Sequence, residues 1–305
     1  HINLTNVCSS NCPLCAFQVE EGDARGFTLE KADIERILAD AKQTKNLSEV
    51  HIVSALHPDK PFSYYRDIVQ MVKAALPAVD VKAFTPVEIV NFAKLEHRSV
   101  EAILRELKEA GLVSLPGGGA EILSDRVRGE LCPNKATAKE WLLAARTAHE
   151  LGIKSNASML YGHIETLAER VDHLLALRSL QDETGGFQTF ICFPFLPANT
   201  ELGQQVKQTS LWDDLRTMAI SRLLLDNFTN IKAYWVMLTV PVAQVALSFG
   251  ANDIDGTVHK ETILHDAGAA SPRALTEDRI IRIIREAGRI PASCDCNFNI
   301  IHRYD

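Results

Sequence analysis

Three cysteines crowd into eight residues near the start of the chain, in the segment Cys8-Ser-Ser-Asn-Cys12-Pro-Leu-Cys15. Three thiolates on one short loop can bind three irons of a 4Fe–4S cubane and leave the fourth iron open for chemistry. A structural zinc site that takes its fourth ligand from a distant His or Cys is the alternative. Two further thiols, in Cys294-Asp-Cys296, are too few for a second cluster.

Polar side chains stand where several β-rich runs end. His57 and Thr85 each follow such a run, and so do Tyr161 and His163. In a parallel α/β barrel the carboxyl ends of the strands meet at one face, where the active sites of this fold lie. His163, with Tyr161 and Glu165 beside it, is therefore a candidate for proton transfer or substrate binding. A structural histidine is the alternative.

A glycine run follows another strand candidate. Gly117-Gly118-Gly119 lacks the Lys-Ser/Thr of a P-loop and the G-x-G-x-x-G spacing. It is either a plain loop or a place where the backbone approaches a flat ligand, since glycine has no Cβ. Glu121 can accept hydrogen bonds from ribose hydroxyls or serve as a helix N-terminal acid. Arg128 can bind a carboxylate with two hydrogen bonds or remain solvated at the surface.

Short β-rich runs alternate with amphipathic helical runs along the whole chain. In the segment after residue 99, for example, Val100, Ile103, Leu104 and Leu107 follow the helical i, i+3, i+4, i+7 spacing. Eight strand–helix alternations predict a (β/α)8 TIM-type barrel in one domain, 1–305, with an open doubly wound sheet as the alternative. The predicted strands are 1–5, 50–54, 79–84, 112–115, 153–160, 187–193, 231–236 and 252–254.

The composition narrows the class of protein. The chain has 305 residues, 46% of them hydrophobic and 23% charged, with a formal net charge of −7. This balance argues against nucleic acid as a partner, because no long basic run is present to neutralise phosphates. No apolar run reaches the roughly 18 residues of a membrane span, so we predict a cytoplasmic protein. Because the chain starts at His1 inside a predicted strand, we expect an N-terminal segment to be missing.

The C-x3-C-x2-C motif resembles that of the radical S-adenosylmethionine superfamily. Leu115-Pro-Gly-Gly-Gly-Ala-Glu121, followed by Arg128, is similar to a branch with two menaquinone-pathway enzymes and a deazaflavin-cofactor enzyme. Within that branch, the segments 158–166, 170–173, 225–228, 232–235 and 250–257 resemble aminofutalosine synthases most. Ser54-Ala55 departs from the two glycines usual in the family, and Ile191-Cys-Phe-Pro194 and Ser293–Asn297 also differ.

The resemblance implies a 4Fe–4S cluster on Cys8, Cys12 and Cys15, with S-adenosylmethionine as co-substrate. It also implies an electron donor such as flavodoxin or ferredoxin. His163 and Arg128 are the candidate catalytic residues. The candidate residues for the cofactor are Leu14, Phe17, Ser54, Ala55, Glu121, Arg128 and Asn156. Those for a small-molecule substrate are His57, Thr85, Gly118, Gly119, Tyr161 and His163.

The resemblance further implies a reaction. The 5′-deoxyadenosyl radical adds to the alkene of 3-[(1-carboxyvinyl)oxy]benzoate, the aryl group migrates, and the carboxylate departs. The product is 6-amino-6-deoxyfutalosine, in menaquinone biosynthesis. Related reactions of the cyclic dehypoxanthine futalosine synthase or deazaflavin-cofactor synthase type are alternatives. A non-enzymatic zinc-binding barrel is a further alternative from another class of protein.

Overall fold

A computed structural model describes residues 1–44, 46–258 and 263–305. Within these ranges eight strands form one parallel sheet in the order β1 to β8. No ladder between β8 and β1 closes the sheet in the part of the chain described, so it is an open, curled barrel. The strands are β1 (Ile2–Asn3), β2 (Glu49–Val53), β3 (Asp80–Ala83), β4 (Leu112–Leu115), β5 (Lys154–Tyr161), β6 (Phe187–Pro194), β7 (Asn230–Ala233) and β8 (Asp253–Ile254).

The predicted (β/α)8 architecture is confirmed, and each predicted strand coincides with an observed one to within a few residues. The largest error lies in the seventh strand, which was predicted to continue to Val236. β7 ends at Ala233, and a short helix begins at Trp235. The Trp235 indole N–H reaches the carbonyls of Asp255 and Gly256 at 3.2 and 3.1 Å, so a tertiary contact overrides the β-propensity of this aromatic segment.

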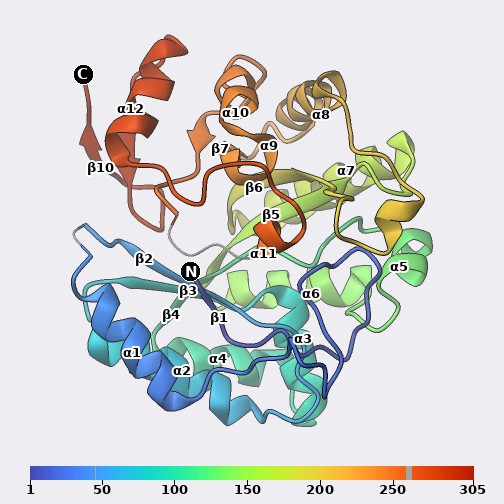
Figure 1. Cartoon of the computed structure of the whole chain (residues 1–305), viewed down its shortest axis with the longest axis vertical. Coiled ribbons are helices and arrows are strands. Elements are labelled where there is room, and N and C mark those ends of the chain that lie inside the picture. Colours follow the sequence, from blue (N-terminus) through green and yellow to red (C-terminus); the bar gives the residue numbers. More distant parts are fainter. Residues whose placement is uncertain (45, 259–262) are drawn as a thin grey trace.

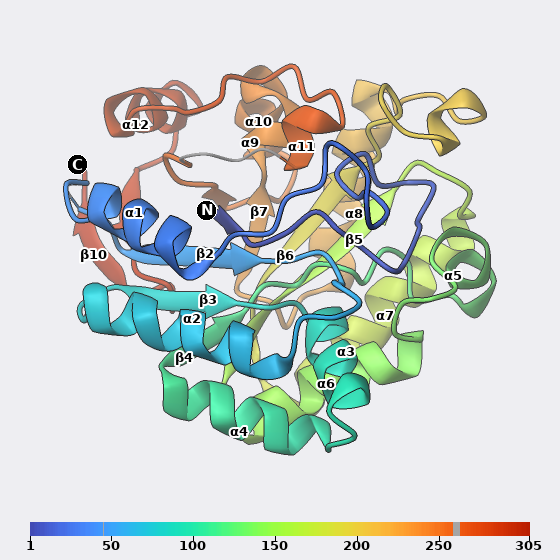
Figure 2. The ribbon, with the colours of Figure 1, turned by 60° about the horizontal axis from the view of Figure 1, so that its bottom comes forward.

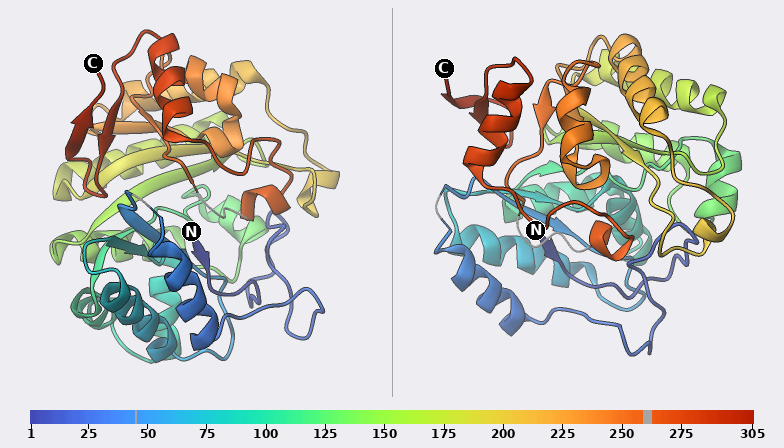
Figure 3. Two further views of the ribbon diagram at one scale, coloured as in Figure 1. Left: turned by 60° about the vertical axis from the view of Figure 1, so that its left-hand side comes forward. Right: turned by 45° about the horizontal axis from the view of Figure 1, so that its top comes forward.

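The helices cover the outside of the curled sheet (Figure 1). Two further views show the same arrangement from other sides (Figure 3). The described helices are α1 (Lys31–Ala41), α2 (Phe62–Ala75), α3 (Pro86–Leu95), α4 (Val100–Ala110), α5 (Asp125–Leu131), α6 (Ala138–Glu150), α7 (Leu167–Thr184), α8 (Leu211–Leu224), α9 (Trp235–Leu238), α10 (Val240–Ala246), α11 (Ile263–Asp266) and α12 (Glu277–Glu286), with a 3-10 turn at Leu202–Gln204.

Helix α4 shows how local sequence sets these boundaries. The Ser99 hydroxyl accepts a hydrogen bond from the Ala102 N–H at 3.1 Å and so caps the first turn. Gly111 ends the helix in the left-handed conformation, with φ of 112°, which glycine adopts without steric cost. Between these ends Ile103, Leu104 and Leu107 are buried. The predicted apolar stripe is therefore the face that packs on the sheet.

The hydrophobic core lies between the sheet and its helices. One cluster of buried apolar residues joins β1–β4 to α1–α4, and a second joins the later strands to their helices. A TIM barrel usually also fills its interior with branched apolar side chains. Here the interior is instead a hollow lined by both apolar and polar side chains, which leaves it available for ligands.

A C-terminal hairpin, β9 (Ala292–Cys294) and β10 (Ile300–Arg303), lies at the amino-terminal end of the barrel (Figure 2). The Gln188 amide donates to the Cys296 carbonyl at 3.0 Å, and the Cys296 sulfur lies 3.3 Å from the Ser114 hydroxyl. The hairpin thereby contacts β4 and β6 and covers the opening of the barrel at the amino-terminal ends of the strands. None of the described helices is long and apolar enough to cross a membrane.

Candidate active site

A cavity of about 1880 Å³ runs through the barrel interior, from the cysteine loop after β1 to the C-terminal hairpin. A pocket for a single small ligand usually measures about 300–1,000 Å³. The cavity is therefore large enough for two ligands, one nearer the cysteine loop and one deeper in the barrel.

The cysteine loop forms one end of this cavity. Cys8, Cys12 and Cys15 all line it, and all three are free thiols. Backbone hydrogen bonds hold the loop: the Cys8 N–H donates to Val19 at 3.0 Å, and the Cys15 N–H to Cys12 at 3.0 Å. Burial raises the pKa of the Cys12 and Cys15 thiols, since desolvation disfavours the thiolate.

These three thiols fit a cubane cluster by their chemistry and their place. They are reduced, they share one loop, and they border a cavity. Within the described residues no three His, Cys, Asp or Glu side chains converge closely enough to bind one metal ion. A cubane does not require that convergence, because the three cysteines ligate three different irons.

Lys135 was not predicted as a site residue, yet it is a buried cation beside the cysteine loop. Its ammonium pairs with Glu121 at 2.9 Å, and both side chains line the cavity. Burial alone would raise the pKa of Glu121, but the Lys135 ammonium outweighs it and holds that pKa below its ordinary value. The same ammonium opposes the effect of burial on the Cys12 and Cys15 thiols. No motif around Lys135 marked it in the sequence.

The loop after β2 is tied to helix α3 through one buried carboxyl group. Glu88 accepts hydrogen bonds from the Ser54 N–H at 2.8 Å and from the Thr85 N–H and hydroxyl, both at 2.7 Å. The carbonyl of Ala55 is already occupied, by the Ser54 hydroxyl at 2.9 Å and the His57 N–H at 3.0 Å. The serine that replaces a family glycine thus takes up acceptor capacity in this loop.

The glycine run approaches the protein's own backbone. A Cβ on Gly117 would lie 2.7 Å from the carbonyl carbon and oxygen of Asn156 in β5. Gly119 has φ of 77°, and its Cβ would lie 2.5 Å from the Val87 side chain. At Gly117 the close approach is made to strand β5, so glycine is needed there for packing, and an approach of this run to a flat ligand stays a prediction.

Arg128 requires a correction. It was predicted to bind a ligand carboxylate, but it is buried outside the cavity wall. Its guanidinium donates to the carbonyls of Ala136 at 3.0 Å, Ala120 at 2.6 Å and Gly119 at 3.2 Å. Those bonds orient the loop that carries Gly119 and Glu121, and they occupy the donors that a ligand would need.

His163, Tyr161 and His57 are likewise not among the cavity-lining residues. In the fully buried His163 ring, Nε2 lies 2.9 Å from the Leu160 carbonyl, and Nδ1 lies 2.8 Å both from the Ile164 N–H and from a Glu165 carboxylate oxygen. The Tyr161 hydroxyl donates to Asp214 at 2.8 Å, between helices outside the sheet. The structure thus places His163 outside the cavity lining, and its catalytic role stays a prediction.

The remaining predicted residues come together around the cavity. They come from the cysteine loop, the ends of β2–β4 and strand β5, as the barrel geometry requires. These residues are Leu14, Phe17, Ser54, Ala55, Thr85, Gly118, Gly119, Glu121 and Asn156.

Comparison with known proteins decides the family. A model of the radical SAM superfamily matches residues 2–177, and a model of the CofH/MqnC C-terminal region matches residues 184–302. The chain belongs to the radical SAM superfamily. It is a radical SAM enzyme, and its cofactors are a 4Fe–4S cluster and S-adenosylmethionine. One continuous sheet carries both matched regions, so we propose a single domain.

Two relatives of this radical SAM enzyme differ in activity. It is 45% identical to aminodeoxyfutalosine synthase from Thermus thermophilus, over 100% of this chain and 82% of the relative. It is 37% identical to 5-amino-6-(D-ribitylamino)uracil–L-tyrosine 4-hydroxyphenyl transferase from Archaeoglobus fulgidus, over 99% of this chain and 87% of the relative. Among solved structures, methylornithine synthase shares the fold, with a TM-score of 0.69 and 16% identity over 96% of this chain and 82% of the other.

Proposed function

We propose that this enzyme is an aminodeoxyfutalosine synthase. It would join the deoxyadenosyl group of S-adenosylmethionine to 3-[(1-carboxyvinyl)oxy]benzoate and yield 6-amino-6-deoxyfutalosine for menaquinone synthesis. The observation that carries this proposal is the 45% identity to the Thermus thermophilus synthase along the entire chain. A cytoplasmic location and an electron donor such as flavodoxin or ferredoxin remain predictions.

Cys8, Cys12 and Cys15 are the residues that would hold the cluster, which supplies the electron that cleaves S-adenosylmethionine when both are bound. Lys135 and Glu121 lie beside this loop and offer a buried ammonium and a buried carboxylate to the co-substrate. The Ser54–Ala55 segment, fixed by Glu88, also lines the cavity, next to the cysteine loop. These groups would hold S-adenosylmethionine at the end of the cavity that borders the cysteine loop.

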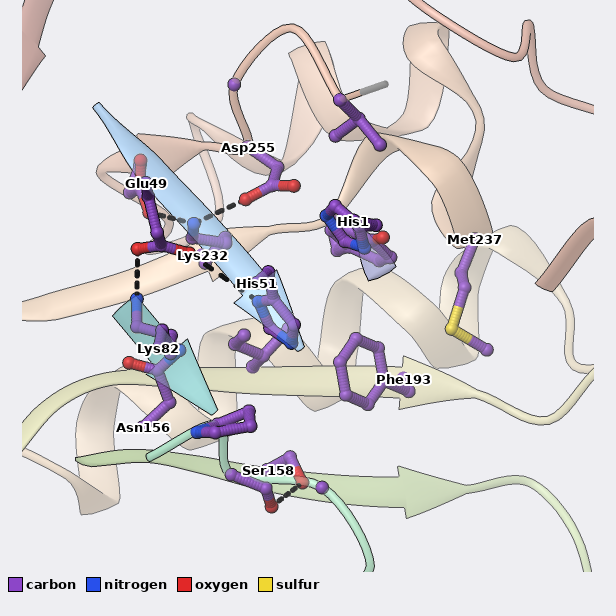
Figure 4. Close-up of a pocket in the computed structure, with 18 of the residues that line it drawn as sticks. His1, Glu49, His51, Lys82, Asn156, Ser158, Phe193, Lys232, Met237 and Asp255 are labelled. Atoms are coloured by element: carbon purple, nitrogen blue, oxygen red, sulfur yellow. Dashed lines mark hydrogen bonds and ion pairs between the residues drawn. The ribbon is translucent and has the colours of Figure 1, made fainter. Parts of the chain in front are cut away.

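The chain's other task is to shield a reactive carbon from water. Ile191, Phe193 and Leu160 line the middle of the cavity with apolar side chains, and Met237 lies near Phe193 (Figure 4). Such walls exclude water and keep the two reactants in contact, and proximity of this kind lowers a barrier substantially. The aryl substrate would lie against this surface.

The test is anaerobic turnover of the reconstituted enzyme with dithionite, S-adenosylmethionine and 3-[(1-carboxyvinyl)oxy]benzoate, followed by mass spectrometry. We expect a product that contains the adenosine unit joined to the aryl group. Methionine without that adduct would refute the proposal. A parallel reaction with tyrosine and 5-amino-6-(D-ribitylamino)uracil tests the activity named for the Archaeoglobus fulgidus relative, and coupling there would replace our proposal.

A further inference from the structure

The deep end of the cavity contains two buried lysines. We call it the lysine chamber and define it by Lys82 on β3, Lys232 on β7, Glu49 on β2, and Asp253 and Asp255 at β8. Figure 4 shows Lys82, Lys232 and Glu49 grouped at one side of the view, with Phe193 and Met237 at the other. The charged side chains and the apolar side chains therefore occupy different sides of the cavity in this view.

Lys82 enters the chamber from β3 with only 7% of its side chain exposed, and its ammonium lies 2.7 Å from a Glu49 carboxylate oxygen. Lys232 enters from β7, 2.5 Å from Asp255 and 3.3 Å from Asp253. A lysine ammonium has three N–H donors. One hydrogen bond to Glu49 and one to Asp255 therefore leave donor capacity on both ammonium groups.

The charges of the chamber do not serve as a barrel core. Each buried charge costs several kcal/mol in desolvation, and apolar side chains of similar volume would stabilise a barrel at least as well. The space between these side chains is instead part of the cavity. The Asn156 side-chain oxygen, buried in the same region, also has no hydrogen-bond partner among the described residues. Unpaired buried polar atoms of this kind usually indicate a ligand or water.

The proposed substrate brings two carboxylates, and few cations are placed to meet them. Among the described lysines and arginines that line the cavity, Lys82 is buried, Lys135 and Lys232 are mostly covered with 16% and 15% of their side chains exposed, and Arg289 is exposed. Lys135 lies beside the cysteine loop, next to the region proposed for S-adenosylmethionine. Burial raises the pKa of the Asp253 carboxyl, and the Lys232 ammonium opposes that effect.

We propose that the lysine chamber binds the ring carboxylate of the aromatic substrate, with hydrogen bonds from the Lys82 and Lys232 ammonium groups. This inference rests on the proposed function. The ring would lie along Phe193, so that its other substituent, the alkene-bearing ether, points toward the cysteine loop. The chamber would thus set both the specificity for a carboxylated aryl group and the direction in which the substrate enters.

The experiment uses the reconstituted holoenzyme and two non-reactive probes, 3-hydroxybenzoate and phenol, whose binding is measured by calorimetry. A charge-assisted hydrogen bond contributes roughly 1.5–3 kcal/mol, which corresponds to about 10–150-fold in affinity. We expect 3-hydroxybenzoate to bind more tightly than phenol by that factor. Equal affinities would overturn the inference.

Two variants test whether the lysine chamber causes the preference for 3-hydroxybenzoate over phenol. Lys82→Met combined with Glu49→Gln removes one of the two ammonium groups without leaving its carboxylate partner unpaired, and we expect it to lower the preference for 3-hydroxybenzoate. Lys154→Met is the matched control, because Lys154 is exposed at the start of β5. Circular dichroism and iron content verify that each variant folds and holds its cluster. An unchanged preference in the double variant would overturn the inference.

Turnover separates this inference from the proposed function. With 3-[(1-carboxyvinyl)oxy]benzoate and 2-phenoxyacrylate as substrates, the wild type should favour the former in kcat/KM by about 10–150-fold, and the double variant should favour it less. Turnover with no such discrimination would refute the chamber and leave the function intact. A lysine-dependent preference in binding without any adduct would refute the function and support an aryl-carboxylate site.

Discussion

Glu88→Gln is the substitution that tests most directly how the loop after β2 is held. Glu88 is fully buried and accepts three hydrogen bonds at 2.7–2.8 Å, two of them from backbone N–H groups. In the variant an NH2 group must face either the Thr85 N–H or the Ser54 N–H. A buried donor that loses its acceptor costs about 1–3 kcal/mol. We therefore expect Glu88→Gln to destabilise the protein by that amount in mildly acidic solution.

The order of stability of the Glu88→Gln variant and the wild type should reverse as the pH rises. Burial raises the pKa of Glu88 from 4.5 to about 7, so the folded state binds a proton more tightly than the unfolded state. The stability contributed by this proton is fully present below 4.5 and is lost as the pH rises through 7. The pKa difference corresponds to about 3 kcal/mol, an order-of-magnitude value. Glutamine does not titrate, so the variant should not lose stability through this group as the pH rises. Its free energy of unfolding should therefore match or exceed that of the wild type near pH 8.

The assay is denaturant unfolding of both proteins under anaerobic conditions, near pH 5.5 and near pH 8. The difference between variant and wild type at each pH removes the contributions of other titrating groups and of the cluster. Stability differences that agree at the two pH values would show that Glu88 does not titrate between them and would refute the reasoning. Affinity for S-adenosylmethionine is a second readout, because Glu88 positions Ser54.

Three further predictions concern packing and the cluster. Gly117→Ala should destabilise the protein by about 1–3 kcal/mol in thermal unfolding, because its Cβ would overlap the β5 backbone. Gly129→Ala in helix α5 is the control, because no atom lies within 4 Å of its new Cβ, and it should stabilise the protein by about 0.5–1 kcal/mol. A Gly117→Ala variant more stable than the Gly129→Ala variant would contradict the structure. Arg128→Met should cost about 3 kcal/mol of stability, since three carbonyls lose their donor, and a fully stable variant with altered KM would restore the ligand role. Cys12→Ala should lose iron, sulfide and the brown colour on reconstitution, whereas Cys192→Ala should keep them, because Cys192 lies fully buried in a hydrophobic core cluster.

Much of the scaffold followed from sequence alone because its signals are local. Caps, apolar stripes and β-branched runs depend on residues a few positions apart, so helix α4 and the eight strands were located to within a few residues. The Cys8–Cys15 loop was recognised for the same reason, since three metal ligands within one short segment need no tertiary information. The barrel then predicts that strand ends converge, which correctly brought Thr85 and Glu121 to the cavity.

The direction of each side chain was decided by the tertiary structure. Arg128 and His163 have the residue types of a catalytic pair, but the structure places both away from the cavity wall, where Arg128 binds the Ala120 carbonyl and His163 contacts the Leu160 carbonyl. Lys82 and Lys232 stand in ordinary strand sequences, yet the curl of the sheet turns both into one chamber. A strand pattern gives the alternation of side chains, but which face is inside depends on how the sheet curls, and the curl is a property of all eight strands together.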